Sequence, residues 1–157
     1  MNAKHKTRVR KLLRGAATAA LVAGSIFAGA AGGNSAHAED VKILGLWPMS
    51  GPFADMGPLL DKGAQIALEE IDYKINGKKI VYITRDSETK AGSAARRAQE
   101  AIDSEGVQYI VGPWSSGVAL AVNEVAKKNK VFYYFSGGTE DIPGKRCHKY
   151  GFQWAEL

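Results

Sequence analysis

Short apolar runs alternate along the chain with stretches in which apolar residues recur every three or four positions. The runs occupy residues 41–47, 80–84, 107–111 and 131–135, and their length and β-branched or aromatic content are typical of strands. The stretches between them predict one helix that starts at Pro58, one from about Ala91 to Gly106, and one from about Gly117 to Asn129. This alternation predicts a three-layer α/β lobe with a parallel sheet and right-handed crossovers.

Several of these segments also carry patterns that predict how they pack. The first helix has apolar positions at Leu60, Ala64, Ala67, Leu68 and Ile71. The second has a face of small residues, Ala94, Ala95, Ala98, Ala101 and Ile102, which favours close packing against a sheet. The run at 131–135 shows no polar alternation, as expected for a strand covered on both faces.

The first 38 residues have the organisation of a secretory signal peptide. Six Lys and Arg residues lie between Lys4 and Arg14, an Ala- and Gly-rich apolar stretch follows, and Ala36-His37-Ala38 supplies a cleavage site. Gly24, Ser25 and Gly29 interrupt the apolar stretch, so it makes a poor transmembrane span. We therefore predict a signal peptide at 1–38 and one incomplete α/β ligand-binding lobe at 39–157.

The net charge of the whole chain does not indicate a nucleic-acid partner. The chain has 21 Lys and Arg against 16 Asp and Glu, but six of the basic residues and none of the acidic ones lie in 1–38. The remaining part is therefore close to neutral, with 15 basic and 16 acidic residues, and binding to a polyanion is not expected.

Residues 39–157 lack the common signatures of metal and nucleotide chemistry. They contain one histidine, His148, and one cysteine, Cys147, and neither is paired with a carboxylate at the spacing of metal ligands. Adjacent residues on a strand point to opposite faces, so these two are not expected to form a nucleophile and base. We find no G-x-S-x-G elbow, phosphate-binding loop or G-x-G-x-x-G motif, and we predict no cofactor. Cys147 is either free or paired outside this chain.

Two small-residue loops follow neighbouring predicted strands. Gly112-Pro113-Trp114-Ser115-Ser116-Gly117 follows the third, and Ser136-Gly137-Gly138-Thr139-Glu140 follows the fourth. The carboxyl ends of parallel strands meet at one edge of a sheet, where hydroxyls and bare N–H groups can hold a ligand carboxylate. Taken singly, each loop has an ordinary alternative: Ser115 and Ser116 could cap a helix, and the glycines could form a plain turn.

Four segments together resemble the leucine/isoleucine/valine-binding type of periplasmic solute-binding protein. They are residues 46–57, the helix with Gly63-Ala64-Gln65-Ile66-Ala67, the turn at 111–116 and the loop at 136–139. The resemblance implies the type 1 periplasmic-binding fold, in which two α/β lobes close on a small-molecule ligand and deliver it to an ABC permease of the inner membrane. It also implies a periplasmic location and no catalysis.

The resemblance assigns roles to individual residues in the first lobe. Ser116 is expected to hold the carboxylate of an amino acid or other carboxylated ligand, Gly137 to offer its carbonyl to the ammonium, and Thr139 to contact the polar end. Met56 is expected to line the cleft near the ligand's side chain, and Ser115 and Trp114 are further candidate ligand-binding residues because the turn at Ser116 could shift by one residue. The family's ammonium-binding acid would follow Leu157, so we interpret the chain as an N-terminal fragment without its second lobe. Cys147 would pair with a cysteine outside it.

Two other function classes stay open on the sequence alone. A receptor or sensor can use the same bilobed fold, and an exported α/β enzyme could keep its catalytic groups outside this chain. The aromatic residues Trp47, Trp114 and Phe53 near the expected cleft permit an aromatic acid as ligand, although buried packing explains such residues more often.

Overall fold

The computed structural model describes residues 39–154, so the signal-peptide prediction for 1–38 lies outside the described residues. This part contains six strands and three helices. The elements are β1 (Val41–Trp47), α1 (Gly57–Glu69), β2 (Lys74–Ile75), β3 (Lys78–Asp86), α2 (Ala91–Glu105), β4 (Tyr109–Val111), α3 (Ser116–Asn129), β5 (Phe132–Phe135) and β6 (Gly151–Gln153). The predicted α/β alternation is confirmed.

The strands form one sheet in the order β2-β3-β1-β4-β5-β6. β1 lies between β3 and β4 and pairs in parallel with both, in a register that sets Trp47 opposite Asp86. The parallel sheet is therefore confirmed over five strands. The edge strand β2 is an unpredicted antiparallel addition, joined to β3 by a tight turn in which Asn76 and Gly77 both have positive φ.

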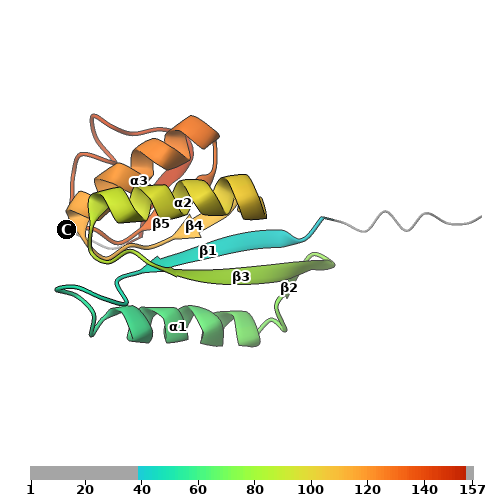
Figure 1. The fold of residues 1–157 in the computed structure, drawn as a ribbon. Helices are drawn as coiled ribbons and strands as arrows, with labels where there is room; N and C mark the ends of the chain where they lie inside the picture. The colour runs from blue at the N-terminus through green and yellow to red at the C-terminus, as the bar shows by residue number, and fades with distance from the viewer. Residues whose placement is uncertain (1–38, 155–157) are drawn as a thin grey trace, which may run out of the picture. The chain divides into compact units, whose positions relative to one another are not determined.

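The helices lie on both sides of the sheet, with α2 and α3 on one face and α1 on the other (Figure 1). The larger core lies between the sheet and the α2–α3 pair, where Leu44, Leu46, Ile110, Tyr133 and Phe135 are fully buried. The small-residue face predicted for α2 is confirmed. Its Ala94, Ala98 and Ala101 are buried, which lets α2 approach closely.

Helix α1 ends earlier than its apolar pattern predicts. It stops at Glu69, and Ile71 lies beyond it with 45% of its surface exposed. The chain turns there because Asp72 and Tyr73 have positive φ and the Tyr73 N–H bonds to the Leu68 carbonyl at 2.9 Å. Neither residue is glycine, so the usual sequence signal for a helix end is missing.

Strand β5 contradicts the prediction of cover on both faces. Tyr133 and Phe135 are buried under α3, but Phe132 and Tyr134 are 43% and 50% exposed on the α1 side of the sheet. Within residues 39–154, α1 packs on β1 and hydrogen-bonds to β3 through Asp61, whereas the helix that packs on β5 and β6 is α3, on the opposite face of the sheet (Figure 1). A run of Phe and Tyr does not reveal whether a strand is buried on one face or on both, because these residues occur at buried and at exposed strand positions.

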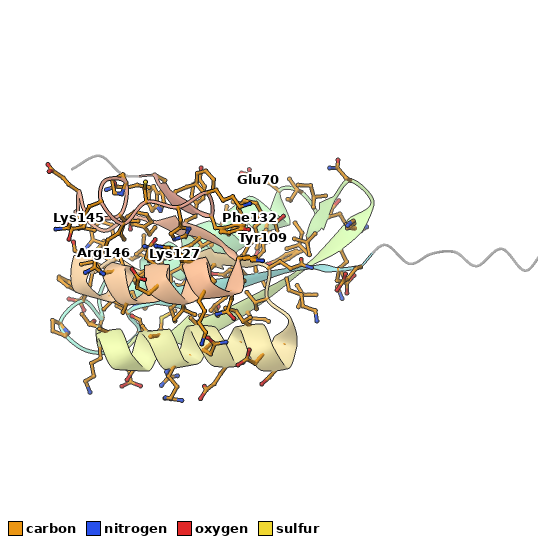
Figure 2. All side chains as sticks on the ribbon, turned by 90° about the horizontal axis from the view of Figure 1, so that it is seen from above. Glu70, Tyr109, Lys127, Phe132, Lys145 and Arg146 are labelled. Atoms are coloured by element: carbon orange, nitrogen blue, oxygen red, sulfur yellow. The ribbon has the colours of Figure 1, made fainter. Side chains whose placement is uncertain are left out.

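The exposed side chains on this side form one stacked group, which we call the aromatic face: Tyr109, Phe132, Tyr134 and Phe152. The ring centres of Tyr109 and Phe132 lie 5.5 Å apart, and Figure 2 shows these two side by side. Phe152 stacks on Phe132 at 6.2 Å and on Tyr134 at 5.9 Å. The stack links β4, β5 and β6 across the sheet.

Membrane insertion finds no support in the described helices. Across residues 39–154, none of them combines the length and the apolar character that crossing a bilayer requires.

Candidate functional site

The end of β4 is held against β1 by a glycine. Gly112 has φ +100°, and a Cβ at this position would collide with the Leu46 carbonyl oxygen. Its N–H donates to the Tyr134 carbonyl at 2.9 Å, which ties the loop to β5. Glycine is needed here because no other residue fits both the conformation and the close approach. The loop that follows β4 thus starts beside the loop that follows β5.

The structure brings the two small-residue loops into contact at Ser116 and Gly137. A Cβ added to Gly137 would lie 3.0 Å from the Ser116 Cα, 3.3 Å from its nitrogen and 3.2 Å from the Ala119 Cβ. The first turn of α3 therefore packs directly on the backbone that leaves β5. This is the convergence that a parallel sheet dictates for neighbouring carboxyl ends.

Ser115 and Ser116 leave donors available at the start of α3. Ser115 is the N-cap residue in an extended conformation, but its side chain makes no capping hydrogen bond. Neither hydroxyl bonds to another residue in 39–154, and the first helical bond there runs from the Ala119 N–H to the Ser115 carbonyl at 2.8 Å. Both residues are half-buried. Two hydroxyls and the first N–H groups of the helix can therefore serve an anion in the positive field of the helix end.

More of the polar groups in the loop after β5 already have hydrogen-bond partners. The Gly137 carbonyl accepts hydrogen bonds from the Thr139 N–H at 3.0 Å and from Gln153 Nε2 at 2.9 Å. The Thr139 hydroxyl oxygen accepts the Asp141 N–H at 3.3 Å, which leaves the hydroxyl hydrogen available. The Ser136 hydroxyl is buried and donates to the Pro113 carbonyl at 3.4 Å.

Gln153 belongs to this region and was not among the residues expected from the sequence. It ends β6, pairs with Phe135 in the β5–β6 register, and is half-buried. Its only sequence signal is that it is the one polar side chain in the run Gly151-Phe152-Gln153-Trp154.

Met56 and Trp114 both follow strands at this edge of the sheet, Met56 in the loop after β1 and Trp114 in the serines' loop after β4. Met56 is the N-cap residue of α1, half-buried, with its N–H on the Phe53 carbonyl at 3.0 Å. It follows β1 rather than β4 or β5. Trp114 is half-buried directly before Ser115. Their predicted roles toward a ligand stay predictions.

Trp47 has the packing role that buried aromatics usually have. It is only 2% exposed, and its Nε1 donates to the Tyr82 hydroxyl at 2.8 Å. Tyr82 in turn donates to Asp61 Oδ1 at 2.8 Å, as Thr84 does, which anchors α1 on the sheet. Burial raises the pKa of Tyr82 well above its usual range, so its hydroxyl keeps its proton.

The Asp86 side chain accepts hydrogen bonds from backbone N–H groups in the loops after β1 and β3. Its Oδ1 accepts the N–H groups of Met49 at 2.9 Å, Ser50 at 3.2 Å and Glu88 at 2.7 Å, and its Oδ2 accepts the Ser50 hydroxyl at 2.7 Å. Partial desolvation pushes the pKa of Asp86 upward, but the hydrogen bonds from Ser50, Glu88 and Met49 outweigh it and hold the pKa below its usual value. The loops after β1 and β3 thus carry their own bound carboxylate.

An apolar hollow of about 300 Å³ opens on the α1 side of this edge. It is lined by Trp47, Leu59, Leu60, Gly63, Ala64, Val111 and Trp154. Its lining does not include Ser115, Ser116 or Thr139.

Cys147 and His148 lie in a loop rather than on the strand assumed from the sequence. Cys147 is exposed. His148 Nε2 bonds to the Asn123 side-chain oxygen at 2.9 Å, and its Nδ1 accepts the Tyr150 N–H at 3.2 Å, so both ring nitrogens are engaged away from the thiol. In the described range 39–154, no three His, Cys, Asp or Glu residues gather as a metal site would require.

Comparison with known proteins places this geometry in a family. A relative from Brucella abortus, "Leu/Ile/Val-binding protein homolog 7", is 37% identical over 123 residues, which cover 77% of this chain and 30% of the relative. The chain thus spans about a third of the length of the curated relatives it matches.

Solved structures give the same fold. The branched-chain amino acid transporter substrate-binding protein LivJ of Streptococcus pneumoniae, in complex with isoleucine, superposes with a TM-score of 0.67 at 30% identity, over 73% of this chain and 33% of that one. An ABC transporter solute-binding protein of R. palustris, in complex with 4-hydroxybenzoate, gives 0.69 at 27% identity, over 75% and 32%. The sheet and its helices are one lobe of the type 1 periplasmic-binding fold.

The family match extends over almost all of the described structure. Residues 40–157 match the family described as "Periplasmic binding protein". With its sheet-edge loops and these relatives, the chain belongs to the periplasmic binding protein family.

Proposed function

We propose that this chain is the first ligand-binding lobe of the substrate-binding component of an ABC importer, which captures a carboxylated small molecule. The observation that carries the proposal is the contact of the Ser116 turn with Gly137, at the edge where two hydroxyls and a helix N-terminus have no other partner in 39–154. The family membership supports it, because relatives of the same fold are solute-binding proteins.

The mechanism would be capture by closure. The ligand's carboxylate would bind at Ser116, with Ser115 and Thr139 as further hydroxyl donors, and Met56 and Trp114 would line the space for the rest of the ligand. A second lobe would then close over the ligand. The ligand stabilises the closed form only by its differential affinity for that form, and an inner-membrane permease would recognise the closed shape.

The proposal also implies a cellular location and a division of the chain into segments. Residues 1–38 would direct export and be removed, and 39–157 would form most of the first lobe of a longer periplasmic protein. It would bind without catalysis, use no cofactor and have no nucleic-acid partner.

Two ligand classes fit a carboxylate site in this lobe. Relatives bind isoleucine in one case and 4-hydroxybenzoate in another, as their structures state. Both ligands share a carboxylate, which is the group that the free donors at Ser115 and Ser116 suit best.

Calorimetric titration of the full-length protein and of the 157-residue chain tests the proposal. Leucine, isoleucine, valine, benzoate and 4-hydroxybenzoate would be titrated into both. We expect the full-length protein to bind at least one of them and the single lobe to show no measurable affinity, because half a cleft leaves the ligand in water. Equal affinity of the two proteins, or no binding of any carboxylate by the full-length protein, would contradict the proposal. Consumption of a bound ligand would instead favour an enzyme.

A further inference from the structure

The backbone carbonyl of Gly137, in the loop that packs on Ser116, is already filled as an acceptor. Gly137 packs on Ser116, and its carbonyl oxygen takes one hydrogen bond from the Thr139 N–H and another from Gln153 Nε2. A carbonyl oxygen has two lone pairs, so this one has no room for a further strong donor. The edge therefore offers donors at Ser115 and Ser116 next to a saturated acceptor at Gly137.

This arrangement distinguishes between two kinds of carboxylated ligand. An α-amino acid carries its ammonium on the carbon next to the carboxylate. A carboxylate held at Ser116 would place that ammonium close to Gly137, where the carbonyl could take it only after the Gln153 amide had left. A ligand without an ammonium group leaves the Gln153 bond intact.

Gln153 is held in place by the backbone around it. β6 pairs in parallel with β5, with Gln153 opposite Phe135, and the Trp154 N–H donates to the Phe135 carbonyl at 3.1 Å. The side chain therefore starts from a fixed position at the same sheet edge as the Gly137 loop. Leaving that position would break the 2.9 Å hydrogen bond from Gln153 Nε2 to the Gly137 carbonyl.

We propose that Gln153 is a specificity-determining residue, which makes the site favour carboxylates without an ammonium group over the matching α-amino acids. This inference rests on the proposed function. It narrows the ligand class to aliphatic or aromatic carboxylates that carry no ammonium group.

Ligand pairs that differ only by the ammonium group test the inference. Leucine would be compared with 4-methylpentanoate, and phenylalanine with 3-phenylpropanoate, by calorimetry on the full-length protein. The variants are Gln153→Ala and Gln153→Met, the second of which keeps the size of the side chain and removes its donor. Gln99→Ala is the matched control, because Gln99 hydrogen-bonds through its amide on α2, away from this edge.

The expected result is a change in a ratio rather than in one affinity. The unaltered protein should bind the ammonium-free member of at least one pair about 10-fold more tightly. Either Gln153 variant should shift that ratio about 10-fold toward the amino acid, and Gln99→Ala should leave it within about twofold. A purely structural Gln153 would weaken both members of a pair alike and leave the ratio unchanged.

The outcomes separate this inference from the proposed function. Binding with an unmoved ratio in both Gln153 variants overturns the specificity role alone, as does a preference of the unaltered protein for both amino acids. No binding of any of the four ligands, together with none in the earlier titrations, removes the proposed function and this inference with it. Two variants are used so that one that fails to fold, judged by thermal denaturation, does not decide the result.

Discussion

Two halves of the same sheet edge treat their polar groups in opposite ways. The loop after β1 (residues 48–51) and the end of β3 with its loop (residues 86–90) are bonded to one another, because the Asp86 carboxylate accepts three backbone N–H groups and a hydroxyl. We call them the self-bonded loops. The loops after β4 and β5, taken as residues 112–116 and 136–139 so that they include the first residue of α3, leave the hydroxyls of Ser115 and Ser116 without a partner in 39–154, and we call them the open loops.

The difference shows where an external carboxylate can compete. In the self-bonded loops a ligand would have to replace a covalently attached Asp86, which pays no entropy of association. In the open loops the donors face no such competitor. The sheet topology alone makes both halves of the edge candidate sites. The hydrogen bonds favour the open loops, because their donors have no partner in the described residues.

The largest effect is expected at the centre of the self-bonded loops. Asp86→Ala should lower the free energy of unfolding by about 3 kcal/mol, because several N–H groups lose a charged acceptor. Asp86→Asn should retain most of this stability, since its amide oxygen can accept the same N–H groups. Urea denaturation measures both, with the exposed Asp103→Asn as control. A loss below about 1 kcal/mol in the Ala variant would show that the self-bonded loops do not depend on Asp86.

The same carboxylate predicts an acid dependence. The folded-state pKa of Asp86 is depressed, so its contribution to stability is present above the unfolded value of about 3.9 and is lost as the pH falls through the folded pKa. Denaturation of the parent and of Asp86→Asn between pH 7 and pH 2 should therefore converge toward the acid end. Parallel curves would contradict this.

A second effect is expected where the open loops touch. Gly137→Ala places a Cβ 3.0 Å from the Ser116 Cα and should destabilise the lobe by about 2 kcal/mol through overpacking. Gly92→Ala is the control, because a Cβ there meets nothing within 4 Å. Urea denaturation of the two variants would show whether the contact is as close as described. If Gly137→Ala were as stable as the unaltered protein, the open loops would have room to separate.

Ser116→Ala should change binding rather than folding. If the Ser116 hydroxyl holds the ligand carboxylate, as the proposed function requires, its loss should weaken the affinity of the full-length protein about 10-fold, or about 1.4 kcal/mol, with little change in thermal stability. Ser104→Ala, on an exposed position of α2, should leave affinity unchanged. An unaltered affinity in Ser116→Ala would place the carboxylate elsewhere on the edge.

The smallest effect is expected from His148, far along the loop that follows the open region. Burial lowers its pKa, so its contribution to stability is present above the unfolded value of about 6.5 and is lost as the pH falls through the folded pKa. Between pH 7.5 and pH 5 the parent should lose slightly more stability than His148→Gln, by less than about 1 kcal/mol. Thermal denaturation across this range measures the difference, and a reversed sign would contradict it.

Much of the fold could be predicted because its signals are local. Helix α2 and its end could be predicted from an alanine face and from Gly106, the residue after the helix, which adopts φ +70°. The end of α1 could not be predicted in the same way, because Asp72 and Tyr73 take up positive φ without glycine. Whether one or both faces of β5 are buried also could not be predicted, because this depends on which elements pack on the strand and not on its own residues.

The candidate site divides along similar lines. The meeting of Ser116 and Gly137 followed from a rule about parallel strands, which needs only the order of elements. Gln153 could not be anticipated, since its bond to Gly137 depends on the register of β6 against β5. Asp86 likewise was visible only as the end of a strand, because its partners Met49 and Ser50 lie more than 30 residues away in the sequence.

The aromatic face constrains how this lobe can persist in water. Tyr109, Phe132, Tyr134 and Phe152 each expose between 40% and 50% of their surface in one contiguous stack. Contiguous apolar surface of this kind promotes colloidal association and recruits chaperones. A lobe that displays it should bind hydrophobic dyes and lose soluble yield as its concentration rises. The soluble lifetime of the lobe would then be limited by the time that the stack stays uncovered.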